Sequence, residues 1–289
     1  SLAATLPRFI ELERKYGSLW RGLKRQPANG GEVQGARYGL FASLAGGLRE
    51  LVSALHDQLA GSVDLRTRTP VESIEGLVSR PGYRLRLRNG QYEEVGGVVL
   101  AVPAFVASHL LRSLDSELAA RLDEIAYASS VIVVSGHSLD DITHPLDAFG
   151  LVVPRVEDRQ VLAVSFASRK LAGRAPGGKV LLRTFVGGAL QPELVDREDD
   201  ELRELVRREL SELLGVGGKP DFEIVCRHDR AMPQYEVGHL ERVDEIERRI
   251  AVFPGLALAG NAYHGVGIPD CIAGGEHAAE RVVGTPGET

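Results

Sequence analysis

The feature that most constrains the fold is a strand, a glycine-bearing loop and a helix start that follow one another near the C-terminus. An apolar run, residues 256–259, leads through a loop to Pro269 and Asp270. Pro269 suits a first helical turn, where its missing N–H is not needed, and Asp270 favours the positive end of the helix dipole. Gly265 and Gly267 carry no Cβ, so the backbone can approach a planar ligand closely. The junction therefore predicts backbone amides and a positive helix end against a ligand, with an ordinary tight turn as the alternative.

Composition limits the classes of protein to which the chain can belong. Its 289 residues, 44% hydrophobic and 26% charged, are typical of a soluble globular protein with one large or two smaller cores. The net charge of −6 argues against a general nucleic-acid role. Neither of the two cysteines, Cys226 and Cys271, lies near a second Cys or a His pair at metal-ligand spacing. We expect both to be buried thiols in a reducing compartment, and we predict no metal site.

The longest uncharged run, Val95 to Leu111, does not have the character of a membrane span. It is interrupted by Gly96-Gly97 and by Pro103, and its pattern changes from strand-like to helical at the proline. It predicts a buried strand followed by a helix.

Local patterns predict further elements along the first half of the chain. Residues 1–24 have nearly helical apolar spacing, and residues 48–59 have a clear amphipathic pattern. Residues 63–74 look strand-like, and residues 38–41 suggest a short strand. The alternation in residues 83–88 meets Asn89-Gly90, a strong hairpin signal. The arginines of that hairpin are interpreted as a solvated face, with an anion-binding patch as the alternative.

The second half begins with a region rich in strands. Apolar runs at residues 131–134, 151–153, 161–166 and 180–186 are spaced as in an antiparallel sheet. Residues 198–214 predict a charged amphipathic helix, and its acidic residues are interpreted as a solvated face with pairs such as Glu204 to Arg208. Residues 27–31 are expected to form a loop, and residues 285–289 a loose tail.

One long stretch resembles a known family. Residues 260–272, Gly-Asn-Ala-Tyr-His-Gly-Val-Gly-Ile-Pro-Asp-Cys-Ile, closely resemble the C-terminal flavin motif of protoporphyrinogen oxidases, which belong to the amine-oxidase-like superfamily. Four further segments resemble the family in the same order: residues 1–24, residues 41–48 with the strand 69–74, residues 184–188 and residues 232–239. The N-terminal βαβ unit with Gly-x-Gly-x-x-Gly, which holds the FAD pyrophosphate, has no counterpart here. The chain therefore looks like the C-terminal part of a longer enzyme.

The resemblance implies an α/β (α+β) fold with two domains that follow the end of a helical region. The end of a helical region would occupy residues 1–35. The remnant of a Rossmann-like FAD domain would comprise residues 36–126 and 236–289. A mixed or antiparallel sheet with helices, residues 127–235, would form the substrate domain.

The resemblance also implies a function and its partners. The family oxidises a porphyrinogen, protoporphyrinogen IX or coproporphyrinogen III, by hydride transfer to FAD in haem biosynthesis, and oxygen or another acceptor reoxidises the flavin. A tetrapyrrole substrate and a cytoplasmic protein follow from it, and peripheral contact with the inner face of a membrane and a homodimer are allowed. The alternatives are an amine oxidase or carotenoid desaturase-like flavoenzyme, and a non-catalytic tetrapyrrole-binding fragment.

Site residues are carried over from the family position by position. The resemblance implies that Val71 contacts the adenine end of FAD and that the backbone of Val266, Gly267 and Ile268 contacts the isoalloxazine ring. It implies that three further residues line the tetrapyrrole pocket: Val152, Ser165 and Phe185. Core packing is the alternative for these three.

No catalytic side chain is assigned from the sequence. His264, in the flavin loop, is the candidate for a proton relay, and His239 is expected to anchor a turn. We favour a reaction in which the cofactor supplies the chemistry, because hydride removal needs mainly an acceptor and geometry. No Ser or Cys has a paired His at a recognisable motif spacing, so a hydrolase is not indicated.

Overall fold

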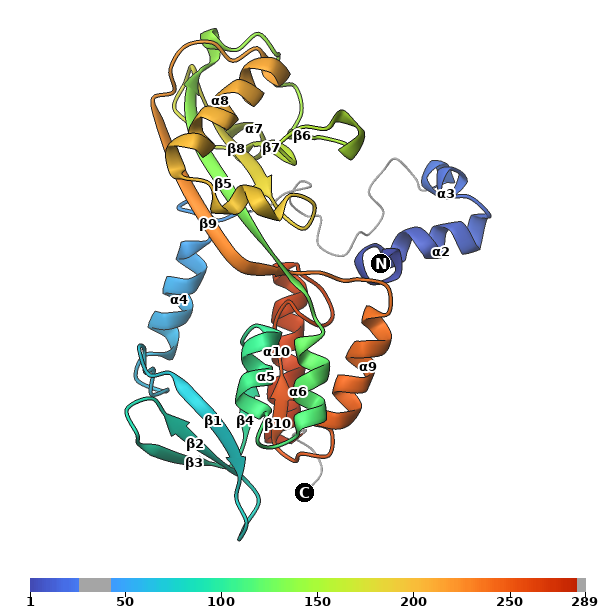
Figure 1. Ribbon diagram of the computed structural model, residues 1–289, viewed down its shortest axis with the longest axis vertical. Coiled ribbons are helices and arrows are strands. Elements are labelled where there is room, and N and C mark those ends of the chain that lie inside the picture. The colour runs from blue at the N-terminus through green and yellow to red at the C-terminus, as the bar shows by residue number, and fades with distance from the viewer. Residues whose placement is uncertain (26–42, 285–289) are drawn as a thin grey trace. The chain divides into compact units, whose positions relative to one another are not determined.

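The computed structural model describes residues 1–25 and 43–284, and its contacts form two compact units (Figure 1). The first contains described residues 1–25, 65–126 and 233–284, and the second contains residues 43–64 and 127–232. The strand expected at 38–41, the loop at 27–31 and the tail at 285–289 lie outside the described residues. The domain limits expected from the family resemblance stay a prediction.

The first unit combines helices with two small sheets. Its helices are α1 (Leu2–Thr5), α2 (Pro7–Tyr16), α3 (Leu19–Arg25), α5 (Ala104–Leu111), α6 (Ser116–Asp123), α9 (His239–Ile250) and α10 (Ile268–Val283). Its strands are β1 (Val71–Gly76), β2 (Tyr83–Leu87), β3 (Tyr92–Val95), β4 (Val98–Leu100) and β10 (Leu256–Leu258). β1, β2 and β3 form an antiparallel sheet, and β4 pairs with β10 in parallel.

Small residues bring α10 close to the parallel pair. Ala257 and Ala259 of the β10 region pack against Ala278 of α10. A Cβ on Gly97 would lie 2.5 Å from Val282 of α10 and 2.9 Å from the carbonyl oxygen of Gly255, so only glycine fits there. These contacts hold the C-terminal half of α10 against β10 and the residues before β4, and they fix the axis of the helix whose start carries the candidate site.

The hairpin predicted from Asn89-Gly90 is present, and its arginines form ion pairs on an exposed face. Arg84 pairs with Glu94 at 2.8 Å, and Arg86 lies 3.4 Å from Glu72. Because these arginines are paired with carboxylates on an exposed surface, they indicate a solvated face and not an anion site. Exposed pairs of this kind contribute little to stability.

The run from Val95 to Leu111 contains β4 and α5, which are separated by Pro103 at the N-cap of α5. No helix in the described ranges 1–25 and 43–284 is long and apolar enough to span a bilayer. The prediction of a strand followed by a helix is confirmed, but the strand is not buried throughout, because Val99 is 38% exposed.

The second unit is built on a five-stranded sheet with the order β6-β7-β8-β5-β9. Its strands are β5 (Tyr127–Ser138), β6 (Gly150–Val152), β7 (Ala163–Phe166), β8 (Lys179–Gly187) and β9 (Phe222–Pro233). Its helices are α4 (Arg49–Leu59), α7 (Ala167–Lys170) and α8 (Asp199–Leu214), with short 3₁₀ turns at Leu139–Asp141, Arg155–Glu157 and Pro192–Asp196. The pairs β6–β7, β7–β8 and β8–β5 are antiparallel, as predicted.

The core of this unit lies between one face of the sheet and α8. Leu202 and Leu210 of α8 pack with Val133 of β5, Val164 of β7 and Leu182 of β8, all of them buried. Because side chains alternate along a strand, the residues between these positions point to the opposite face of the sheet.

The acidic residues of α8 depart from the expected solvated face at one position. Glu209 is buried and accepts a 3.1 Å bond from Arg159. The expected pair of Glu204 with Arg208 is not formed, since Arg208 donates to the side chain of Gln160 at 2.9 Å. The sequence interpretation was wrong here because residues 159–160 approach α8 from a distant part of the chain.

One predicted strand is shorter than expected, and two further elements were not predicted. The strand expected over residues 63–74 begins only at Val71, because a turn with Arg68 at φ +57° precedes it. The long strand β9 and the helix α9 had no counterpart in the sequence interpretation. β9 is charged and mostly exposed, so it lacks a strong hydrophobic signal.

Candidate functional site

The predicted strand, loop and helix are present at the C-terminus. α10 begins at Ile268 with Gly267 as its N-cap, and Pro269 lies in its first turn. Asp270 Oδ2 accepts a 3.3 Å bond from the Gly267 N–H, so this carboxylate caps the helix. A Cβ on Gly265 would lie 2.5 Å from the same oxygen, which explains a glycine at this position.

Two backbone amides at this turn are open. Val266 and Ile268 have exposed side chains, 52% and 47%, and their N–H groups donate no hydrogen bond within the part of the chain that the structure describes. The Gly267 amide, by contrast, is taken by Asp270. Open amides at the positive end of a 16-residue helix suit a planar ligand with negative charge at its edge.

Buried aromatic side chains anchor the loop that leads to this turn. The Tyr235 hydroxyl donates to the carbonyl oxygen of Asn261 at 2.8 Å, and its ring stacks on His239 at 3.9 Å. His239 Nε2 lies 3.1 Å from the carbonyl oxygen of Tyr263. Burial lowers the pKa of His239, so the neutral ring donates this bond. His239 therefore anchors a turn, as expected, and the turn is the one that carries the open amides.

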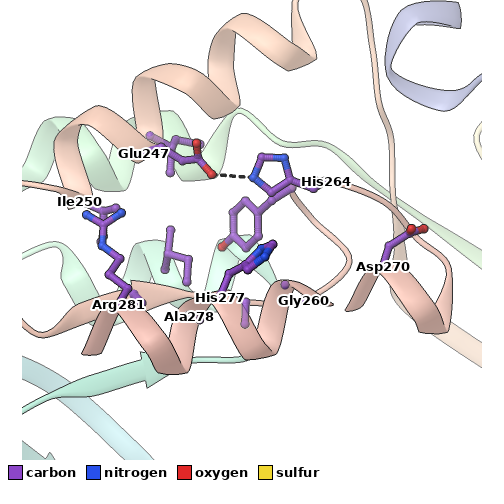
Figure 2. A pocket seen from close by; sticks show the side chains of 14 residues that line it. Glu247, Ile250, Gly260, His264, Asp270, His277, Ala278 and Arg281 are labelled. Atoms are coloured by element: carbon purple, nitrogen blue, oxygen red, sulfur yellow. Dashed lines mark hydrogen bonds and ion pairs between the residues drawn. The ribbon is translucent and has the colours of Figure 1, made fainter. Parts of the chain in front are cut away.

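His264 is held by a carboxylate and not by a buried network. Its Nε2 lies 2.5 Å from Glu247 Oε1 of α9. The side chains of His264 and Glu247 are 58% and 50% exposed. Figure 2 shows the two side chains pointing toward one another. An exposed pair can bridge the loop to α9, and nothing in its geometry singles His264 out as a catalytic base.

A cavity of about 210 Å³ lies beside the turn, between α9, β10 and α10 (Figure 2). Gly260 and Asp270 line one part of it, and His277 and Arg281 of α10 line another. Its lining does not include residues 266–268. The cavity is therefore adjacent to the predicted flavin contacts and distinct from them.

Val71 lies in the same unit as this turn but in the other sheet. It is the first residue of β1, half-buried, and it pairs with Leu87 of β2 just before an irregularity of register at Ser73. Pro70 before it keeps the backbone extended. The role of Val71 at the adenine end of FAD stays a prediction.

The three residues predicted to line a tetrapyrrole pocket lie on one face of the second unit's sheet. Val152 of β6 is opposite Ala163 of β7, and Ala163 is opposite Phe185 of β8. Val152, Ala163 and Phe185 therefore form one row across the sheet. Ser165 lies two residues after Ala163 and points to the same side. This face is the one opposite α8. Val152 is 79% exposed, and Ser165 and Phe185 are half-buried, so none of the three belongs to the fully buried core.

A pH dependence of stability follows from the buried histidines. Burial lowers the pKa values of His239 and of His137, whose Nε2 lies 2.9 Å from Ser135 Oγ. The unfolded chain binds these protons near the ordinary pKa of 6.5, whereas the folded chain does not. This contribution to stability is complete above pH 6.5 and is lost as the pH falls through the lowered pKa values.

We therefore expect the urea midpoint to fall from pH 7.5 to pH 5.5, and to fall less in the variant His239→Gln. Glutamine can still donate to the Tyr263 carbonyl but cannot titrate. His56→Gln, at an exposed histidine of α4, is the control and should keep the wild-type slope. An unchanged slope in His239→Gln would contradict the assignment of a buried neutral ring.

Comparison with known proteins decides the family. The model of the flavin-containing amine oxidoreductases matches residues 1–283. The chain belongs to this flavin-containing amine oxidoreductase family. The description of this family is that of flavin-containing oxidoreductases, and membership agrees with the mixed helices and sheets of the fold.

Individual members of the family are similar over nearly the whole chain. Coproporphyrinogen III oxidase from Staphylococcus aureus is 33% identical over 98% of this chain and 61% of its own length. Protoporphyrinogen oxidase from Bos taurus is 29% identical over 99% of this chain and 62% of its own length. A solved structure described as a protoporphyrinogen oxidase from Exiguobacterium is 30% identical, with a TM-score of 0.81 over 96% of this chain and 58% of that one. The chain thus spans about three fifths of these relatives.

The sequence pattern placed Asp270 at the positive end of the helix dipole but did not predict that it caps the helix by accepting a bond from the Gly267 N–H, three residues earlier. It also did not place Arg183 beside the residues predicted to line the tetrapyrrole pocket. Arg183 stands two residues before Phe185 in a predicted strand, so alternation alone would have placed both on one face. By contrast, no local signal pairs Glu247 with His264.

The two cysteines are less buried than expected. Cys226 and Cys271 are free thiols, but both are half-buried, so the expectation of full burial was wrong. Cys226 lies on β9, which is mostly exposed, and Cys271 lies in the first turn of α10. Among residues 1–25 and 43–284, no group of three or more His, Cys, Asp or Glu side chains could hold a metal ion.

Proposed function

We propose that this chain forms part of an FAD-dependent oxidase that converts a porphyrinogen, coproporphyrinogen III or protoporphyrinogen IX, to the porphyrin in haem biosynthesis. The observation that carries the proposal is the pair of open amides, Val266 and Ile268, at the capped start of α10. The names of relatives at 29–33% identity support the choice of substrate.

The residues at the start of α10 fit a flavin. When bound, FAD supplies the hydride acceptor, and negative charge gathers at one edge of its ring on reduction. The amides of Val266 and Ile268 and the helix dipole would stabilise that charge. Gly265 and Gly267 keep side chains away from the ring, and Asp270 holds the turn through the Gly267 N–H. Val71 would contact the adenine end.

The sheet face of the second unit would receive the macrocycle. Val152 and Phe185 would provide apolar contact for a tetrapyrrole, and Ser165 would lie beside them. With FAD bound, a hydride would pass from the porphyrinogen to the cofactor at each oxidation, a proton would pass to solvent, and oxygen or another acceptor would take up the two electrons. The proposal extends to a cytoplasmic protein that contacts the inner face of a membrane peripherally and can form a homodimer.

The experiment is to purify the gene product that contains these residues, record its flavin spectrum, and assay it with coproporphyrinogen III and protoporphyrinogen IX. We expect bound FAD and formation of fluorescent porphyrin from at least one of the two. A flavin-loaded protein that oxidises amines or desaturates a carotenoid instead would favour the second candidate, which the family description supports. Tetrapyrrole binding without flavin would favour a non-catalytic binding fragment.

A further inference from the structure

One charged side chain shares the sheet face that carries the predicted tetrapyrrole contacts. Arg183 of β8 lies opposite Ser165 of β7 on one side and Val134 of β5 on the other. Cross-strand partners point to the same side of a sheet, so Arg183 belongs to the face of Val152, Ser165 and Phe185. This places a guanidinium within one residue row of the predicted apolar contacts.

The position of the guanidinium is set by the neighbouring ring. Its central carbon lies 5.5 Å from the centroid of the Phe185 ring, a cation–π contact between residues two apart on one strand. A guanidinium carries five N–H donors, so this ring contact leaves donors available for other partners. No carboxylate lies within ion-pair distance of Arg183 among the residues that the structure describes, and its side chain is exposed.

Small residues flank this cation on the side of β6 and β7, whereas Val134 of β5 is its neighbour on the other side. Ser165 is its direct neighbour, Ala163 lies opposite Phe185, and Gly150 lies opposite Ser165. A Cβ on Gly150 would lie 2.4 Å from the carbonyl oxygen of Val164, so this position cannot carry a larger side chain without a backbone shift. The face therefore presents an aromatic ring and Val152, a floor of small residues, and one cation without an acidic partner.

We propose that Arg183 recognises a carboxylate at the edge of the tetrapyrrole and thereby selects substrates that carry acidic side chains. The inference deepens the proposed function and rests on it, because porphyrinogens combine an apolar macrocycle with peripheral carboxylates. The planar guanidinium can bind a carboxylate with two parallel hydrogen bonds. The macrocycle would lie against Phe185 and Val152 while the carboxylate meets Arg183 and Ser165.

The test compares coproporphyrin III with its tetramethyl ester, in the same detergent, by quenching of porphyrin fluorescence on the full chain. We expect Arg183→Met to raise the Kd of the free acid about tenfold and to leave the Kd of the ester unchanged. Arg183→Lys should fall between the wild type and Arg183→Met, because lysine keeps the charge but not the planar fork. Arg208→Met, which removes an exposed arginine of α8 on the opposite side of the sheet, is the matched control and should bind like the wild type.

The outcomes separate this inference from the proposed function. If the wild type binds the free acid and Arg183→Met binds it equally well, the inference is overturned and the proposed function stands. If Arg183→Met weakens the acid and the ester alike, the effect is one of packing, and the inference is again overturned. If the wild type binds neither form, the tetrapyrrole-binding face itself is contradicted. Circular dichroism of each variant, together with Arg183→Lys, guards against a loss of folding.

Discussion

Leu202→Ala is expected to lower the free energy of unfolding of the second unit by about 2–5 kcal/mol. Leu202 is fully buried on α8 and belongs to the cluster that includes Val164 and Leu182 of the sheet. Truncation removes the transfer free energy of its methyl groups and leaves a cavity, because strands on the other side of the core cannot close in on it. Guanidinium denaturation followed by circular dichroism measures the change.

The control for this prediction is Glu201→Ala, one residue earlier on the same helix. Glu201 is exposed, so its removal should change the free energy of unfolding by less than about 0.5 kcal/mol. A loss below about 1 kcal/mol for Leu202→Ala would mean that α8 is not packed against the sheet as described.

Ile268→Pro is expected to lower the affinity for FAD by about tenfold to a hundredfold. The substitution deletes one of the two open amides and leaves the backbone nearly unchanged, since proline is tolerated at the first residue of a helix. Gly267 already has φ −72° and ψ 149°, a conformation that a residue before proline adopts readily. A hydrogen bond to a charged group contributes about 1.5–3 kcal/mol, which corresponds to this range.

The measurement is FAD titration by flavin fluorescence on the protein that contains this chain. Ile268→Ala is the matched control, because it removes the exposed side chain but keeps the N–H, and it should bind FAD within a few-fold of the wild type. Equal affinities of Ile268→Pro and Ile268→Ala would show that this amide does not contact the flavin. In that case the proposal that rests on the start of α10 would lose its main support.

Elements with strong local signals were predicted well. The hairpin at Asn89-Gly90 and the helix α8 follow from turn chemistry and from apolar periodicity, which act over a few residues. The strand, loop and helix at the C-terminus follow from Pro269, Asp270 and the glycines in the same way. β9 was not predicted because its residues are largely charged and exposed. α9 has a clear amphipathic pattern, with Val243, Ile246 and Ile250 buried on one face, so the sequence alone could have predicted it.

The sequence by itself determined the kind of site: a glycine-bearing turn at a helix start, with a motif typical of flavoenzymes. Only the tertiary structure decided which distant groups hold that turn and which residues are neighbours on the sheet of the second unit. His239 and Tyr235 bond to the loop across more than 20 residues, and strand register places Arg183 opposite Ser165. The physical reason is that turns and caps are fixed by nearby residues, whereas register, burial and partner choice are fixed by packing between segments that meet only in the folded chain.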